Sequence, residues 1–313
     1  MTRTRLRFNN RAEWLEARKD GIGASEVATI VGLNPYDTPY QLWRRKIGLD
    51  APKEENFAMK AGHYLEDAVA RFYADESGRE IIKSSDGDFM FVDANKPFLR
   101  VSPDRTFWLS DMTRNDNNKG VLECKTTQKT IDPDDLPKTW FCQVQMNLGV
   151  AGYEQGSIAW LTAGREFGWR DITFSPDFYG WLVEEVERFW IDNILGKKEP
   201  IATNVRDVLL KFNRHVDGKQ IEVGDDLFNV YSELKEIKEE LAKLDTRKEE
   251  LEGQLKMAFK DAEKMTYAGE TIATWKASKP SMKLDTKLLL ERYPNIAEEV
   301  THPAQGVRRL LLK

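Results

Sequence analysis

Hydrophobic and polar residues follow two different patterns along the chain, and the change falls near residue 200. Before it, helix-like and strand-like segments alternate. The longest helical pattern covers residues 57–76, where apolar residues share one face. Further helices are predicted from Asn10, from Ser25, at 140–152 and at 175–190, and strands at 88–93, 98–102, 106–109, 120–126, 157–162 and 170–174. This order predicts an α/β (α+β) fold with a mixed central sheet flanked by helices.

The most regular pattern lies in residues 225–264. Apolar residues recur at alternating spacings of three and four, interrupted only by Lys248, with Glu and Lys between them. Such an a/d heptad repeat predicts a long coiled-coil helix. Two interpretations stay open: an amphipathic helix packed on its own chain, or an arm that binds another subunit or a partner. Lys248 at an a position weakens a long dimer seam and slightly favours the first.

These patterns divide the chain into four segments. Residues 1–200 form the mixed α/β domain, and residues 201–224 read as a connection because they are polar and interrupted by glycine. The heptad helix of 225–264 follows. Residues 265–313 return to a mixed pattern and are predicted to form a small α/β tail.

Composition excludes several classes of protein. The chain has 313 residues, of which 41% are hydrophobic and 11% aromatic, so it is not mainly disordered. It contains no apolar run of membrane-spanning length, and its polar, arginine-bearing start does not resemble a secretory signal. Its two cysteines are too few for a disulfide framework or a zinc cluster. A cytoplasmic location is therefore expected.

The charge of the chain is −5, from 47 basic and 52 acidic residues. This balance argues mildly against a protein that coats DNA, which would usually be basic. It does not argue against a nuclease, because metal-binding carboxylates lower the net charge. The first 50 residues carry 9 basic and 6 acidic residues, so any basic patch is expected there.

Two short strings near predicted strands carry the candidate chemistry. Asp104 closes the string Ser102-Pro103-Asp104, and Glu123 precedes Lys125 by two residues. Two antiparallel strands can bring these carboxylates to one edge of a sheet, where hard divalent cations find oxygen ligands. Lys125 shares a strand face with Glu123, and a lysine beside a metal-bound water can position that water or take its proton, as in metal-assisted phosphodiester hydrolysis. Alone, the two strings are a weak signal, since such strings arise by chance and a surface Asp and a surface Glu–Lys pair are the simpler explanation.

Four further residues strengthen this interpretation, and each has an ordinary structural alternative. Glu66 lies beside the apolar face of the 57–76 helix, although a solvated helix glutamate is common. Gln143 could bond a phosphate or a water, or be a satisfied interior amide. Arg18 precedes Ser25 by seven residues, and a guanidinium at a helix start binds phosphate well. Alternatively, Ser25 is a plain N-cap.

The ordered set of motifs resembles a known family. The chain contains W-x3-R-x2-G-I-x-A-S-E from Trp14, then GHYLED, SPD, E-x-K and QVQ. Over residues 11–192 this order is similar to the YqaJ-type viral recombinase (phage lambda exonuclease) family of PD-(D/E)xK nucleases. The resemblance implies a restriction-endonuclease-like core and a Mg²⁺-dependent 5′-to-3′ exonuclease on double-stranded DNA, with Mn²⁺ able to substitute. It also implies a phage or prophage origin, a role in homologous recombination in the bacterial cytoplasm, a single-strand-annealing partner and a ring-shaped trimer.

The resemblance also implies a role for each matching residue. Asp104 and Glu123 match the metal-binding carboxylates, and the carbonyl of Cys124 matches a further ligand. Glu66 matches the third acidic residue of the metal site. The remaining matches are Lys125 as the catalytic lysine, Gln143 as the first glutamine of QVQ, and Arg18, Ser25 and Ser102 as residues that hold the 5′-phosphate.

Other functions remain open at this point. An endonuclease or nickase of the same fold would cut a covalently closed plasmid, which an exonuclease leaves intact. A non-catalytic interaction protein would use the heptad helix as its binding element. The residues after about 200 have no counterpart in the short relatives, so their role stays undecided.

Overall fold

The computed structural model describes residues 3–51, 56–82, 89–110, 114–282, 284–301, 306 and 308–312. The chain forms two compact units, Met1–Lys211 and Phe212–Lys313, called the first and the second unit below. The first unit contains β1 (Arg3–Arg7), α1 (Arg11–Lys19), β2 (Ile22–Gly23), α2 (Ala24–Ile30), α3 (Pro39–Lys46), α4 (Phe57–Ser77), β3 (Ile81–Ile82), β4 (Phe89–Asp93), β5 (Leu99–Val101), β6 (Arg105–Trp108), the 3-10 turn η1 (Asp116–Asn118), β7 (Lys119–Thr127), α5 (Lys138–Ala151), β8 (Gln155–Thr162), β9 (Glu166–Thr173), α6 (Pro176–Arg188), the π-helical η2 (Phe189–Leu195) and α7 (Val205–Lys211).

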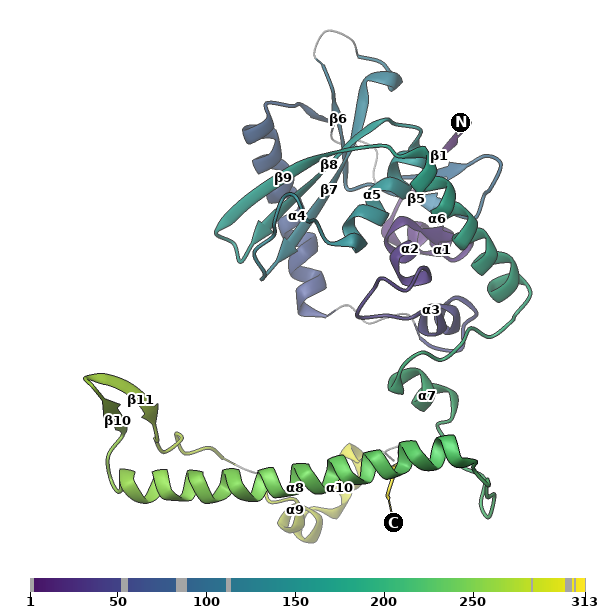
Figure 1. Ribbon diagram of the computed structural model, residues 1–313. Coiled ribbons are helices and arrows are strands. Elements are labelled where there is room, and N and C mark those ends of the chain that lie inside the picture. The colour runs from purple at the N-terminus through teal and green to yellow at the C-terminus, as the bar shows by residue number, and fades with distance from the viewer. Residues whose placement is uncertain are drawn as a thin grey trace. The chain divides into compact units, whose positions relative to one another are not determined.

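A five-stranded mixed sheet forms the centre of the first unit, in the order β3-β6-β7-β8-β9. The pair β7–β8 is parallel, and the other pairs are antiparallel. The parallel pair needs a crossover, which α5 supplies. Figure 1 shows β7, β8 and β9 side by side with α4 next to them. The predicted class, a mixed sheet flanked by helices, is confirmed.

Strand β7 sends alternate side chains to two different cores. Leu122 packs with Val69 and Tyr73 of α4, whereas Val121 belongs to the large core that includes the buried residues of α5. Since successive residues of a strand point to opposite faces, Glu123 and Lys125 lie on the same face as Val121. The alternation therefore directs the candidate catalytic side chains toward α5.

A second sheet, in the order β1-β4-β5-β2, was not predicted as a separate element. Its strands β1 and β2 were missed, because β2 has only two residues and β1 carries three arginines in five positions. The helix expected to begin at Ser25 begins instead at Ala24, because Glu26 accepts a hydrogen bond of 2.8 Å from the N–H of Gly23. Of the predicted strand 88–93, residue 88 lies outside the described residues.

The second unit consists of one long helix and smaller elements. Helix α8 (Asp225–Phe259) ends five residues earlier than the heptad pattern predicts, and the hairpin β10 (Lys264–Tyr267) and β11 (Glu270–Thr274) follows it. The ring of Trp275 packs on Phe259, with ring centroids 6.0 Å apart. Two short helices complete the unit, α9 (Thr286–Arg292) and α10 (Pro294–Val300). None of the helices described in either unit is both long and apolar enough to cross a bilayer.

Candidate nuclease site

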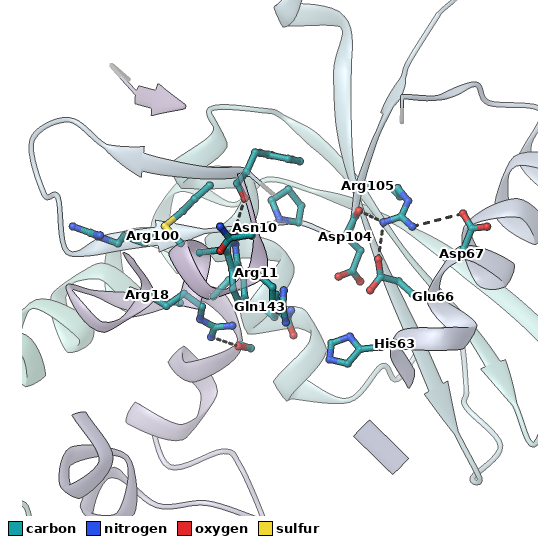
Figure 2. Close-up of a pocket in the computed structure, with 18 of the residues that line it drawn as sticks. Asn10, Arg11, Arg18, His63, Glu66, Asp67, Arg100, Asp104, Arg105 and Gln143 are labelled. Carbon is teal, nitrogen blue, oxygen red and sulfur yellow. Dashed lines mark hydrogen bonds and ion pairs between the residues drawn. The ribbon is translucent and has the colours of Figure 1, made fainter. Parts of the chain in front are cut away.

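A cleft of about 600 Å³ opens in the first unit between the start of α1 and α2 on one side and α4 on the other. Figure 2 shows Arg18 on one side of Gln143, and Asp104 and Glu66 on the other. Six of the nine residues predicted from the sequence line this cleft, namely Arg18, Ser25, Glu66, Ser102, Asp104 and Gln143. The other three, Glu123, Cys124 and Lys125, join it through the contacts below.

Asp104 reaches the strand that carries Glu123 through the backbone. Antiparallel pairing sets Arg105 of β6 opposite Leu122 of β7, so the residue before β6 lies beside the residues after Leu122. There the Asp104 Oδ2 atom accepts a hydrogen bond of 2.7 Å from the N–H of Cys124. The strand register therefore brings together two carboxylates that are 19 positions apart in the sequence.

Glu123 is buried, with only 2% of its side chain exposed, and every described contact of its carboxylate comes from a donor. Lys125 Nζ donates to its Oε1 atom at 2.8 Å, and Gln143 Nε2 donates to the same oxygen. Asn147 Nδ2 donates to the Oε2 atom at 3.0 Å. Lys125 Nζ also lies 2.8 Å from Gln143 Oε1. These bonds give the buried charge the partners it needs.

The two carboxylates and the lysine change one another's protonation. Burial, and after it the charge of Glu123, raises the pKa of Asp104 to about 7. Burial alone lowers the pKa of Lys125, but the charges of Glu123 and Asp104 raise it more, so its pKa lies above the ordinary value. Lys125 is therefore an ammonium at neutral pH and donates hydrogen bonds.

Glu66 faces the same part of the cleft but has a cationic partner of its own. Arg105 Nη1 donates to Glu66 Oε1 at 2.6 Å and to the backbone carbonyl of Asp104 at 2.5 Å. Burial, and then the charge of Asp104, raises the pKa of Glu66. The structure thus places Glu66 near Asp104. Arg105 bonds the carboxylate of Glu66 and the backbone carbonyl of Asp104, and its positive charge partly balances the two acidic groups.

Arg18 and Arg11 stack on the ring of Trp14, with the guanidinium carbons 4.8 Å and 3.9 Å from a ring centroid. In the described residues neither guanidinium has a carboxylate partner. Arg18 Nη2 lies 3.4 Å from the Ser25 hydroxyl. A Cβ atom at Gly23 would lie 2.9 Å from that same nitrogen, so glycine leaves room for the guanidinium. The two cations are held in place and remain available to an anion.

Ser102 is placed differently from Ser25. Its hydroxyl donates to the carbonyl of Phe89 at 2.8 Å and accepts a bond of 3.1 Å from Trp14 Nε1. In the described structure Ser102 therefore fixes the ring on which Arg18 and Arg11 stack.

Sequence reasoning missed three residues that shape the site. Asn147 bonds Glu123 from one helical turn beyond Gln143, and its position on the same face of α5 was a usable signal. Arg105 directly follows Asp104 in the sequence but gives no sign of its pairing with Glu66. Arg11 is seven residues before Arg18, the spacing of two helical turns, and could have been recognised as part of the same face.

The side chains present fit a hard divalent cation. Within the described residues, no three His, Cys, Asp or Glu side chains converge as a complete metal-binding group. Mg²⁺ does not need one, because it usually keeps several waters and binds through one or two carboxylates together with substrate phosphate oxygens. Asp104 and Glu123 supply two carboxylates, and the raised pKa of Asp104 marks a place where positive charge is stabilising.

Comparison with known proteins places this geometry in a family. A model described as "YqaJ-like viral recombinase domain" matches residues 13–154, which include all nine predicted site residues. The uncharacterized protein YqaJ of Bacillus subtilis (strain 168) is 31% identical over 303 residues, covering 93% of this chain and 91% of the relative. The chain belongs to the YqaJ-like viral recombinase family. The resemblance expected from the ordered motifs is thus confirmed, and it extends through the second unit.

Two solved structures are similar to part of this recombinase-family chain. An alkaline exonuclease from Laribacter hongkongensis is 18% identical, with a TM-score of 0.46, and covers 59% of this chain and 93% of its own. A phage-related exonuclease from Haemophilus somnus 129PT is 11% identical, with a TM-score of 0.41, and covers 56% of this chain and 96% of its own.

Proposed function

We propose that this recombinase-family chain is a Mg²⁺-dependent deoxyribonuclease that digests double-stranded DNA from 5′ ends and leaves 3′ single strands. One observation carries the proposal: two carboxylates, Asp104 and Glu123, meet beside Lys125 at the edge of a cleft whose far side holds two guanidiniums that have no carboxylate partner among the described residues. Acidic ligands, a lysine and phosphate-binding cations are the groups that hydrolysis of a phosphodiester needs.

Each residue of the site has a definite task in this proposal. Asp104, Glu123 and the carbonyl of Cys124 would hold Mg²⁺, with Glu66 as the third acidic residue once Arg105 releases it. When bound, Mg²⁺ supplies charge stabilisation to the phosphate and lowers the pKa of a water. Asp104 is fixed by the Cys124 N–H, so one carboxylate oxygen keeps a constant position.

Lys125 acts on the water and the phosphate, and Gln143 holds Lys125 in position. Because the pKa of Lys125 is raised, its ammonium donates hydrogen bonds: it orients the attacking water and stabilises the negative charge that builds on the phosphate. Gln143 bonds both Lys125 and Glu123 and thereby holds the ammonium against the carboxylate. Asn147 fixes the second oxygen of Glu123 in the same way.

The cations on the other side of the cleft would set the direction of digestion. Arg18 and Ser25 can bind a terminal 5′-phosphate through charge-assisted hydrogen bonds. Ser102 contributes by holding Trp14, and through it the guanidinium of Arg18. A strand anchored by its 5′-phosphate would present its first internucleotide bond to Asp104 and Glu123.

The product suits a role in recombination. Single strands with 3′ ends are the substrate of an annealing protein, so a phage single-strand-annealing protein is the proposed partner. A ring-shaped trimer is the proposed assembly of the first unit, since enclosing the duplex would let an acidic protein remain on DNA without strong electrostatic attraction.

End-labelled linear duplexes and a covalently closed plasmid test this function. With Mg²⁺, we expect early release of a 5′ label, late release of a 3′ label and an intact plasmid; with a chelator, we expect no release. Asp104→Asn is the matched inactive control. Early release of the 3′ label would refute the direction, and plasmid cleavage would identify an endonuclease or nickase instead.

A further inference from the structure

Helix α8 carries an apolar stripe, interrupted by Lys248, that the described residues of the second unit leave exposed. The exposed fraction of its large a and d residues runs from 37% at Leu234 to 65% at Leu244, with the hairpin and both short helices in place. The stripe consists of Leu227, Val230, Leu234, Ile237, Leu241, Leu244, Leu251, Leu255 and Ala258. An apolar strip of this length marks an interaction surface.

The form of the stripe indicates what covers it. It is only two positions wide in every seven, and mostly charged residues border it on both sides. A helix that packs on a sheet or in a globular core needs a wider apolar face, whereas a two-stranded coiled coil needs only this seam. The partner is therefore a single helix with a matching heptad and complementary flanking charges.

A second copy of α8 placed in parallel brings two pairs of like charges together. In a parallel, in-register pair, Lys248 would face Lys248 of the other copy inside the seam. Glu240 at a g position would face Asp245 at the e position of the other copy. Both contacts place like charges together, one of them at a buried position. The other two charged g–e pairs of the parallel arrangement are attractive, so these two contacts are what disfavours it.

The antiparallel arrangement removes both conflicts. With a two-fold axis between Ala242 and Lys243, Leu241 faces Leu244 of the second copy, and each a residue meets a d residue. Lys248 then faces Ile237 of the second copy, so its stem can pack on an apolar side chain while the ammonium reaches water. The remaining layers pair Leu227 with Ala258, Val230 with Leu255, and Leu234 with Leu251.

The flanking charges are complementary in the same register. At the g positions, Glu240 lies opposite Arg247 of the second copy. At the e positions, Lys238 lies opposite Asp245 of the second copy. The two-fold axis repeats each attraction, and the outer pairs, Glu233 with Gln254 and Tyr231 with Glu252, oppose no like charges.

We propose that α8 pairs with α8 of a second copy of this chain as an antiparallel, two-fold symmetric coiled coil. The overlap of residues 227–258 spans about 48 Å at 1.5 Å per residue. Four and a half heptads of apolar seam with complementary flanks are enough for a specific pair. The pairing joins copies two by two, whatever assembly the first unit forms, and does not depend on the activity proposed above.

Charge reversal distinguishes the two orientations in the full-length protein. Glu240→Arg would oppose Arg247 of the second copy twice, and we expect the dissociation constant of the pair to rise about 10-fold by sedimentation velocity. Adding Arg247→Glu to the same chain restores both attractions and should return the affinity to the wild-type value. Glu236→Arg is the matched control, because it makes the same change at a c position outside the seam and should leave the affinity unchanged.

The opposite result would overturn the proposal. In a parallel pair Glu240→Arg would face Asp245 of the other copy and tighten the association. A wild-type affinity for Glu240→Arg would show that this face does not bind a second copy, and would leave another partner as its occupant.

Disulfide trapping tests the register directly. In Leu234→Cys/Leu251→Cys, the two positions lie 17 residues apart, about 25 Å along one helix, so no disulfide can join them within a chain. Oxidation of the full-length protein should yield a peptide that links position 234 to position 251, identified by mass spectrometry apart from the native Cys124 and Cys142. Leu234→Cys alone is the control and should give no linked dimer at that position. Links of 234 to 234 and 251 to 251, or no link at all, would refute the antiparallel pair.

Discussion

The first unit buries charged side chains, whereas the second unit exposes apolar ones. Glu123 lies in the interior with a complete set of donors around its carboxylate. Among the described residues of the second unit, the only large apolar side chain that is fully buried is Phe259. A unit with two sheets and covering helices has an interior in which charges can be desolvated and aligned for chemistry. A single long helix has no interior, so it gains apolar burial only by association.

The largest expected effect comes from the two carboxylates of the proposed metal site. Glu123→Gln and Asp104→Asn should each lower the rate of DNA hydrolysis at least ~10³-fold, because metal-centred charge stabilisation is worth several kcal/mol of the barrier. Hydrolysis is measured on labelled duplex, and sedimentation checks that both variants keep the wild-type assembly. Activity within tenfold of wild type would remove these residues from the site.

Lys125 should have a smaller effect that separates catalysis from metal binding. Lys125→Ala removes the ammonium that orients water, and we expect about a 10²-fold loss of rate, as for other groups that assist proton movement. Cation binding, followed by calorimetry, should persist because Asp104 and Glu123 remain. If cation affinity disappeared together with activity, Lys125 would be a structural partner of Glu123.

The anion side of the cleft is expected to affect only the choice of DNA ends. Wild-type protein should prefer 5′-phosphorylated over 5′-hydroxyl duplex ends, and Arg18→Ala should lose about 10- to 100-fold of that preference, the value of one charge-assisted contact. Lys19→Ala is the matched control, since Lys19 is exposed and paired with Glu16. Equal rates on both ends with the wild-type protein would contradict a phosphate site at Arg18.

Stability should depend on pH through Asp104. Because the pKa of Asp104 is raised from 3.8 to about 7 in the folded chain, the folded state binds a proton that the unfolded state releases between these pH values. The free energy of unfolding therefore falls as pH rises from about 4 to about 7. Without metal, Asp104→Asn should raise the free energy of unfolding over wild type by about 2 kcal/mol at pH 8 and by almost nothing at pH 4. The value at pH 8 is smaller than the full pKa shift would give, because Asp104 is only partly buried and solvent screens its charge.

Chemical denaturation at several pH values with a chelator measures this difference. Asp132→Asn serves as a control, because its side chain lies on an exposed turn. An equal effect of Asp104→Asn at pH 4 and pH 8 would show that the charge of Asp104 is not destabilising in the metal-free chain.

The smallest effect on activity is expected from removing the second unit. Truncation after Lys211 leaves every residue of the cleft in place, so the hydrolysis rate should stay within about threefold of wild type. The same truncation should abolish the α8 pairing and lower the mass seen by light scattering. A truncated chain that is soluble but inactive would show that the first unit needs the second unit for hydrolysis.

The same truncated chain tests whether the proposed annealing protein binds the second unit. Because a second copy of this chain covers the stripe on α8, the stripe is not the binding surface of the proposed annealing protein. Full-length and truncated chains should therefore bind the annealing protein with equal yield in a pull-down. Loss of the annealing protein on truncation would move its binding surface to the second unit.

Local sequence determined the elements whose signal is periodic. Residues 57–76 were predicted as a helix and form α4, and residues 120–126 were predicted as a strand and form the middle of β7. The alternation within β7 also placed Glu123 and Lys125 on one face, and the order of the short motifs indicated the family. These features follow from spacing within one segment, which the chain carries whatever its tertiary structure.

Tertiary structure alone decided which groups meet. The 2.7 Å bond from the Cys124 N–H to Asp104 depends on the register that sets Arg105 opposite Leu122. The pairing of Glu66 with Arg105, and the use of the Ser102 hydroxyl to hold Trp14, join segments 39 and 88 residues apart. No local pattern encodes such contacts, because strand register and helix packing are chosen by the burial of the whole core. In α8 the reverse holds: the heptad and its charges specify the register of the pair, and the tertiary structure adds only that the stripe stays exposed.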